Sequence, residues 1–189
     1  MDGGSPAKEN PDGKGVFFVC GVHGAGKTTL CASLASELSI PYFSSSALIK
    51  SHGGIIPQET HEKKVQDIKG NQDILIAAVG SKLKEALYFL LDGHTTILDE
   101  NGQWQPIPPS VFREIHIRAL ICLEVPPDEV AKRLQKRDGA SPDIATITFH
   151  QKAELEQAQK ITRELSIPFY LTDGDTKALL PEIERLNHK

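Results

Sequence analysis

A glycine-rich stretch that directly follows an apolar run most limits what this chain can fold into. Residues 21–28 read GVHGAGKT and fit the pattern G-x-x-x-x-G-K-[ST]. Glycines there let backbone N–H groups turn inward around phosphate oxygens, which side chains would obstruct. The helix predicted to follow adds the partial positive charge of its N-terminus. The stretch therefore predicts a site for the phosphates of ATP or GTP.

Two side chains of this motif have chemical roles in such a site. We expect Lys27 to reach the β- and γ-phosphates and the Thr28 hydroxyl to ligate Mg²⁺. A chance match in a glycine turn is the alternative, and the buried strand and amphipathic helix predicted on either side argue against it. The residues expected to bind the nucleotide here are Gly21, His23, Gly24, Ala25, Gly26, Lys27, Thr28 and Thr29.

Apolar runs alternate with helical patterns along the rest of the chain. This alternation is typical of βαβ units and predicts an α/β three-layer sandwich with a parallel sheet of about five strands. Ligands of such sheets bind beyond the carboxyl ends of the strands, where the glycine-rich stretch lies. We expect strands at 15–20, 40–44, 87–93, 117–125 and 167–174, and helices at 27–39, 45–50, 58–87 (broken near Gly70-Asn71), 126–138, 146–165 and 175–186.

Length and composition suit one domain with an ordinary core. The 189 residues are expected to form a flexible leader (1–14) and a single domain (15–189). A net charge of −4 gives no sign of a nucleic-acid surface, and no apolar stretch approaches the ~20 residues that span a bilayer. Three cysteines without a C-x-x-C pair predict neither a zinc site nor a disulfide framework. Cys20 and Cys122 are expected in the core, and a reducing, cytoplasmic compartment is the default.

Three further stretches resemble the adenylate-kinase-like group of small P-loop nucleotide kinases. The first, YFSSSALIK at 42–50, is similar to the segment that opens the monophosphate-binding region of that family. The resemblance implies that Ser44, Ser45 and Lys50 contact the acceptor substrate. The family's Asp and Arg places hold Ala47 and Lys50, and lysine lacks the bidentate fork that grips a phosphate. A solvated lysine at a helix end is the alternative for Lys50.

The second stretch, FLLDGH at 89–94, is similar to the end of the family's third strand. The resemblance implies that Asp92 helps to hold Mg²⁺ through water; a turn aspartate before Gly93 is the alternative. Adenylate kinases continue with Phe-Pro-Arg, whereas this chain has His94 and two threonines. The Asp-x-His order resembles atypical nuclear adenylate kinases, which also hydrolyse ATP. His94 is expected either to orient a water or contact the substrate, or to be bonded at the sheet edge.

The third stretch, residues 119–139, is similar to the family's fourth strand, the helix after it and the start of its lid. The resemblance implies that Arg133 and Arg137 stack on the adenine and neutralise phosphates, with a solvated helix face as the alternative for Arg133. The lid is expected to be short, because no arginine follows between Gly139 and Lys152. Arg163 is interpreted as a surface charge. Residues 171–175 resemble the loop that borders the adenine in such kinases, and Asp173 and Asp175 in it are only weak candidates for contacts with the nucleotide.

Asn101-Gly102 predicts a β-hairpin beside the site. The single tryptophan, Trp104, is expected either to pack against the sheet or to line the acceptor pocket.

The resemblance implies a Mg²⁺- and ATP-dependent phosphotransferase, with a nucleoside monophosphate as the first candidate acceptor. The expected catalytic residues are Lys27, Asp92, His94 and Arg137, with Thr28 and Asp92 at the metal. One alternative is an ATPase that couples hydrolysis to a protein partner. A kinase of another small hydroxyl acceptor or of a nucleic-acid end is a second, and a nucleotide sensor without turnover is a third.

Overall fold

The computed structural model describes residues 13–54, 64–65, 67–139 and 143–187 of the chain. Its centre is a five-stranded sheet in which every neighbouring pair is parallel. The strands lie in the order β2 (Tyr42–Ser44), β4 (Tyr88–Asp92), β1 (Gly15–Cys20), β7 (Ile117–Leu123) and β8 (Phe169–Thr172). This confirms the predicted parallel α/β sheet. Of the expected leader, only Gly13 and Lys14 lie within the described residues.

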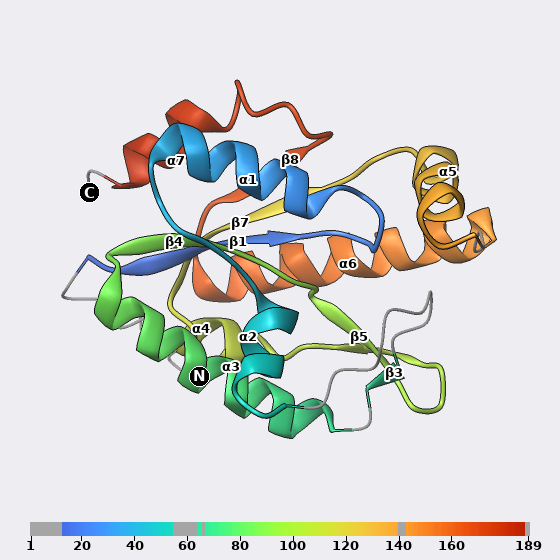
Figure 1. Ribbon diagram of the computed structural model, residues 1–189, viewed down its shortest axis with the longest axis horizontal. Coiled ribbons are helices and arrows are strands. Elements are labelled where there is room, and N and C mark those ends of the chain that lie inside the picture. Colours follow the sequence, from blue (N-terminus) through green and yellow to red (C-terminus); the bar gives the residue numbers. More distant parts are fainter. Residues whose placement is uncertain (1–12, 55–63, 66, 140–142, 188–189) are drawn as a thin grey trace, which may run out of the picture.

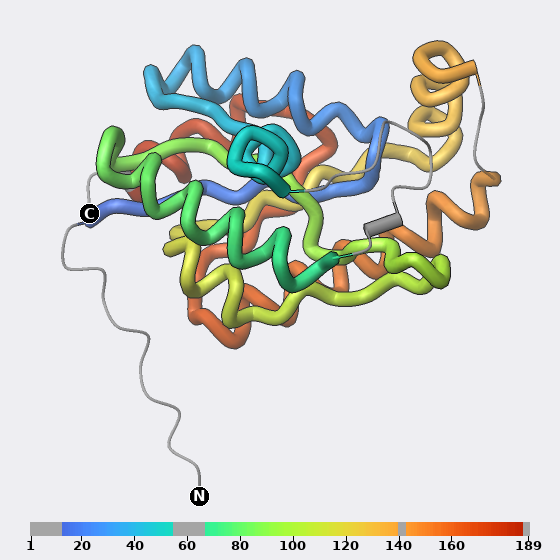
Figure 2. The backbone as a smooth tube through the Cα atoms, turned by 60° about the horizontal axis from the view of Figure 1, so that its bottom comes forward, coloured from blue at the N-terminus to red at the C-terminus, as the bar shows by residue number. Residues whose placement is uncertain are grey.

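Helices cover both faces of the sheet and make the molecule three-layered (Figure 1). One face carries α1 (Lys27–Leu38) and α7 (Leu180–Asn187), and the other carries α3 (Ile68–Glu85), α4 (Pro109–Glu114) and α6 (Ile144–Leu165). The short α2 (Ser45–Ser51) packs beside α3. Helix α5 (Pro127–Asp138) stands beyond the carboxyl end of the sheet and leads into α6 (Figure 2).

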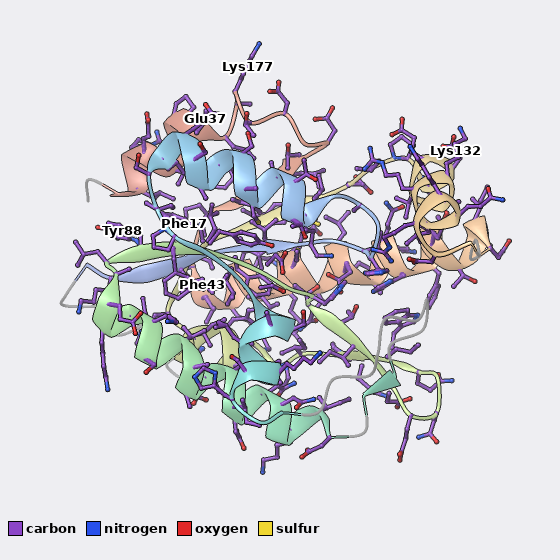
Figure 3. All side chains as sticks on the ribbon, in the orientation of Figure 1. Phe17, Glu37, Phe43, Tyr88, Lys132 and Lys177 are labelled. Atoms are coloured by element: carbon purple, nitrogen blue, oxygen red, sulfur yellow. The ribbon has the colours of Figure 1, made fainter. Side chains whose placement is uncertain are left out.

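The burial of β1 explains why its sequence is a continuous apolar run. All six of its residues are buried, because helices pack on both faces of this central strand. Successive side chains point to opposite faces: Phe17 joins the core cluster under α1, and Phe18 joins the cluster with α3 and α4. Figure 3 shows Phe17 and Phe43 on opposite sides of the sheet.

A second, smaller sheet lies beside the site. Strands β5 (Thr96–Asp99) and β6 (Trp104–Pro106) pair antiparallel around Asn101-Gly102, which confirms the predicted hairpin. The two-residue β3 (Lys64–Val65) adds to β5 in parallel, so the helix predicted from residue 58 is wrong at this point. The other residues of its first part, 58–63 and 66, lie outside the described residues.

Aspartates that cap helices explain where the observed ends differ from the predicted ones. Helix α3 runs through Gly70 without the predicted break, because the Asp67 side chain accepts a hydrogen bond from Gly70 N at 2.8 Å. A Cβ at Gly70 would lie 2.1 Å from that carboxylate, so glycine there makes room for the cap. Asp143 caps α6 two residues earlier than expected.

Helix α7 starts at Leu180 instead of 175, because Asp173 and Asp175 accept backbone hydrogen bonds in local turns. Helix α5 ends at Asp138 and α6 begins at Ile144, and residues 140–142 of the expected short lid lie outside the described residues.

Candidate active site

The glycine-rich loop lies at the carboxyl end of β1 and leads directly into α1. Gly21, Gly24 and Gly26 all have positive φ, at 145°, 83° and 106°. A Cβ at Gly21 would lie 2.6 Å from the carbonyl oxygen of Leu123, and one at Gly24 would lie 2.8 Å from the Leu134 side chain. The glycines therefore satisfy the backbone conformation and also let the loop fit closely against β7 and α5.

One cavity of about 860 Å³ opens beside this loop. From the loop and the start of α1 it is lined by His23, Gly24, Gly26, Lys27 and Thr28. The other residues predicted to bind the nucleotide do not line it: Gly21 and Ala25 are buried, and Thr29 is exposed. The structure thus brings five of the eight predicted loop residues to the cavity, Lys27 and Thr28 among them.

The Lys27 ammonium lies inside the curve of its own loop. Its Nζ donates hydrogen bonds to the carbonyl oxygens of Gly21 at 2.7 Å and Val22 at 3.1 Å. Burial lowers the pKa of Lys27, while the carboxylates of Glu154 and Asp92 act in the opposite direction. The loop holds one positive charge at the point where the motif predicts phosphates.

Asp92 is the last residue of β4 and only 7% exposed. It lines the cavity together with Lys27 and Thr28, as expected for a carboxylate that shares a metal with the nucleotide. Its Oδ2 accepts a hydrogen bond from the Tyr42 hydroxyl at 2.5 Å. Burial and this contact raise the pKa of Tyr42, so the phenol remains a donor. The carboxylate of Asp92 is therefore oriented by the Tyr42 hydroxyl. An aspartate that only formed a turn before Gly93 would not need this hydrogen bond.

His94 belongs to a buried cluster formed with α6. Glu154 is fully buried and accepts hydrogen bonds from the backbone N–H groups of Thr95 and Thr96 and from the Thr96 hydroxyl. His94 Nδ1 and His150 Nε2 lie 3.7 and 3.6 Å from Glu154 Oε1. Glu154 thus fixes the loop that follows Asp92.

The charges in this cluster are set by burial. Burial and the charge of Lys27 lower the pKa of His94 to about 4, so its ring is neutral at pH 7. Burial alone would raise the pKa of Glu154, but the nearness of His150 and His94 outweighs it and holds the pKa well below its ordinary value. Glu154 is a buried anion beside a neutral imidazole.

Arg133 and Arg137 reach the cavity from α5. Arg133 Nη1 donates to the carbonyl oxygen of Ala25 at 2.6 Å and so braces the glycine-rich loop. Arg137 contacts His23 of the same loop and the Asp138 side chain. Both guanidinium groups lie on the nucleotide side, as the resemblance implies.

The far half of the cavity is mostly apolar. Phe18, Leu75, Phe112 and other apolar side chains form its wall, and Trp104 lines it while stacking on His150 with ring centroids 3.5 Å apart. Of the two expectations for Trp104, the pocket-lining one is therefore correct. Ser44, Ser45 and Ser46 contribute hydroxyls, and Ser45 Oγ is buried with no hydrogen-bond partner among the described residues.

Several predicted candidates lie elsewhere. Lys50 is exposed on α2 and is not among the residues that line the cavity, so its predicted contact with the acceptor stays a prediction. Arg163 is exposed as expected. Asp173 and Asp175 serve the turns before α7 and do not line the cavity. All three cysteines are free and buried, in agreement with the predicted core positions of Cys20 and Cys122.

The sequence reasoning missed Tyr42, His150 and Glu154. A signal for two of them was present: His150 and Glu154 fall on the buried stripe of α6, in register with Ile147, Ala158 and Ile161. Polar residues on the apolar face of an amphipathic helix require buried partners. Tyr42 gave no such signal, because one tyrosine in a short strand is ordinary.

Comparisons with known proteins place the chain among P-loop proteins. A family model described as an AAA domain matches residues 20–148. An adenylate kinase of Thermoplasma acidophilum is 22% identical over 170 residues, which cover 88% of each chain. An adenylate kinase of Streptomyces avermitilis is 28% identical over 170 residues, or 85% of this chain and 74% of that protein.

Solved structures show the same fold. A sugar kinase from Janibacter sp. HTCC2649 superposes with a TM-score of 0.55 at 19% identity, covering 92% of this chain and 94% of that one. A gluconokinase from Sinorhizobium meliloti 1021 gives a TM-score of 0.51 at 16% identity, covering 92% and 91%. No helix among the described residues is long and apolar enough to cross a membrane.

The enzyme class that these findings support is a P-loop kinase. Because the family model spans more than half of the chain and includes the phosphate-binding loop, the protein belongs to the AAA-domain family of P-loop proteins.

Proposed function

We propose that this protein transfers the γ-phosphoryl group of ATP to the hydroxyl group of a small, uncharged acceptor. The observation that carries the proposal is one cavity lined by Lys27, by Thr28 and by a buried carboxylate, Asp92. Phosphoryl transfer needs positioning and charge neutralisation more than covalent help, and this arrangement supplies both.

The nucleotide side is built from the loop and α5. Backbone N–H groups of the loop and the Lys27 ammonium would bind the phosphates, and Arg137 would neutralise charge that develops during transfer. Thr28 and Asp92 would hold Mg²⁺, whose role is to neutralise charge on the phosphate oxygens. The hydroxyl and carboxylate that this ion prefers both line the cavity, so the residues fit it.

The acceptor side supports a neutral substrate. Among the described residues that line the cavity, the permanently charged cations are Lys27, Arg133 and Arg137, and all three lie at the loop or on α5. An acceptor phosphate would enter a region of apolar side chains, serine hydroxyls and the neutral His94. A nucleoside monophosphate remains the second candidate, because the curated relatives are named adenylate kinases.

With a neutral hydroxyl as acceptor, Asp92 would act as the general base. It would take the proton from the acceptor hydroxyl, whose oxygen then bonds to the γ-phosphorus, while the bond to the β-phosphate oxygen breaks and its electron pair leaves with ADP. The hydrogen bond from the Tyr42 hydroxyl to Oδ2 would hold the Asp92 carboxylate in place during this step.

The test is nucleotide consumption with Mg²⁺ and ATP under three conditions, with all products separated. The conditions are no acceptor, a panel of nucleosides, sugars and polyols, and a panel of nucleoside monophosphates. A phosphorylated product from the uncharged panel supports the proposal, and Asp92→Asn should abolish its formation. A diphosphate formed only from a monophosphate would replace our acceptor by the second candidate. ADP and phosphate formed equally in all three conditions would instead indicate an ATPase.

A further inference from the structure

We propose that His94, His150 and Glu154 form a binding site for a divalent transition metal of the zinc class. The site is separate from the one suggested for Mg²⁺ at Thr28 and Asp92, and the proposal does not depend on the proposed function. Two imidazoles and a carboxylate are a donor set typical of zinc, and the three ligand atoms lie within 4.8 Å of one another.

Two of the three separations between these atoms are close to those of a tetrahedral centre. His94 Nδ1 lies 3.7 Å and His150 Nε2 3.6 Å from Glu154 Oε1, which is too long for a hydrogen bond. Ligands held at the Zn–N and Zn–O bond lengths of about 2.1 Å in a tetrahedron are about 3.4 Å apart. Both nitrogens are buried, and neither has a hydrogen-bond partner among the described residues. A metal ion between the three atoms would satisfy both nitrogens at once.

The surrounding structure holds the three ligands in place. His150 and Glu154 are one turn apart on α6 and so point from the same helix face. Trp104 stacks on the His150 ring and limits its rotation. The backbone N–H groups of Thr95 and Thr96 donate to the Glu154 carboxylate and fix its position beside the two imidazoles.

One coordination position would face the cavity. His94 and His150 both line it, whereas Glu154 lies behind them and does not. Three protein ligands with an open fourth position are the arrangement of catalytic zinc sites, where water or a substrate oxygen completes the shell. A metal here would bind a water molecule on the side of the cavity.

Cobalt(II) titration of the full-length protein, freed of metal with a chelator, tests the site directly. Co²⁺ in a tetrahedral or five-coordinate protein site absorbs visible light far more strongly than hydrated Co²⁺, so one equivalent should produce an intense band. Zinc should displace the band. His150→Gln and Glu154→Gln should each weaken Co²⁺ binding by more than about 100-fold, because each removes a ligand rather than a supporting group.

His52→Gln is the matched control. His52 bonds to the Leu48 carbonyl oxygen on α2 and does not line the cavity, so this variant should bind Co²⁺ like the parent protein. Melting curves of every variant without metal would separate lost binding from lost folding. Only the weak spectrum of hydrated Co²⁺, or an intense band that persists in both ligand variants, would overturn the proposal. A thiolate charge-transfer band would do so too, since it would assign the metal to cysteine.

Discussion

The Tyr42 hydroxyl donates a hydrogen bond to Oδ2 of Asp92 from the neighbouring strand. Asp92 ends β4 opposite Ser44, and Tyr42 reaches its carboxylate from the start of β2, two residues before Ser44. The contact fixes the orientation of the carboxylate to which we assign the proton transfer.

Replacing Tyr42 by phenylalanine should lower the turnover number about 10- to 100-fold, because a hydrogen bond to a charged group contributes about 1.5–3 kcal/mol. The KM for ATP should change little, since Tyr42 is not among the residues that line the cavity. Steady-state kinetics check both values. Tyr170→Phe is the control, because its hydroxyl bonds Glu182 beside α7. Equal turnover in both variants would remove Tyr42 from the mechanism.

Replacing Lys27 by alanine should reduce ATP turnover by about 100-fold or more, because the phosphates lose their principal positive partner. Lys132→Ala should leave turnover unchanged, since Lys132 pairs with Asp128 on the exposed side of α5 (Figure 3). Rates and melting temperatures are measured together, because Lys27 also bonds the loop carbonyl groups. Wild-type turnover in a folded Lys27→Ala protein would refute the assignment of the loop.

Replacing Glu154 by alanine should destabilise the fold by about 3 kcal/mol or more, because it leaves buried N–H groups of Thr95 and Thr96 without an acceptor. Glu154→Gln should cost clearly less, since its amide oxygen still accepts. Urea unfolding gives both values, and Glu156→Ala, at an exposed position of the same helix, is the control. A cost for alanine no greater than for the control would mean that the loop finds other partners.

The cysteines should be nearly inert in the native protein. Burial raises the pKa of the Cys20 and Cys31 thiols, so at pH 8 the reactive thiolate is scarcer than in free cysteine. Each unit of that rise lowers the thiolate fraction tenfold, and we expect Cys31 to react at least about 100-fold more slowly than free cysteine. A chromogenic disulfide reagent at pH 8 checks this, with all three thiols counted in denaturant. Rapid reaction of one native thiol, mapped to Cys31, would show that α1 opens readily.

The sequence was sufficient for the nucleotide half of the site because that half is local. The loop, the strand before it and the helix after it are contiguous in the chain. An apolar run, the glycine motif and a helical spacing of apolar residues therefore predict all three together. Arg133 and Arg137 lie more than a hundred residues away and were identified only by resemblance to a family. The structure places both beside the loop.

The acceptor half could not be predicted in the same way. Its chemistry depends on which helix packs behind the loop after Asp92, and no local pattern specifies that pairing. Glu154 meets Thr95 across 59 positions of sequence. Lys50 occupies the family's place for a cation, but in the structure it lies on an exposed helix face. The short β3 was missed because two residues carry too little pattern to distinguish a strand from a helix.

The stacking of Trp104 on His150 provides an intrinsic fluorescence signal for folding. Trp104 is the single tryptophan, and its partner reaches it only after α6 has docked against the β5–β6 hairpin. In a refolding experiment, the indole emission therefore reports when α6 docks against the hairpin and completes this wall of the cavity.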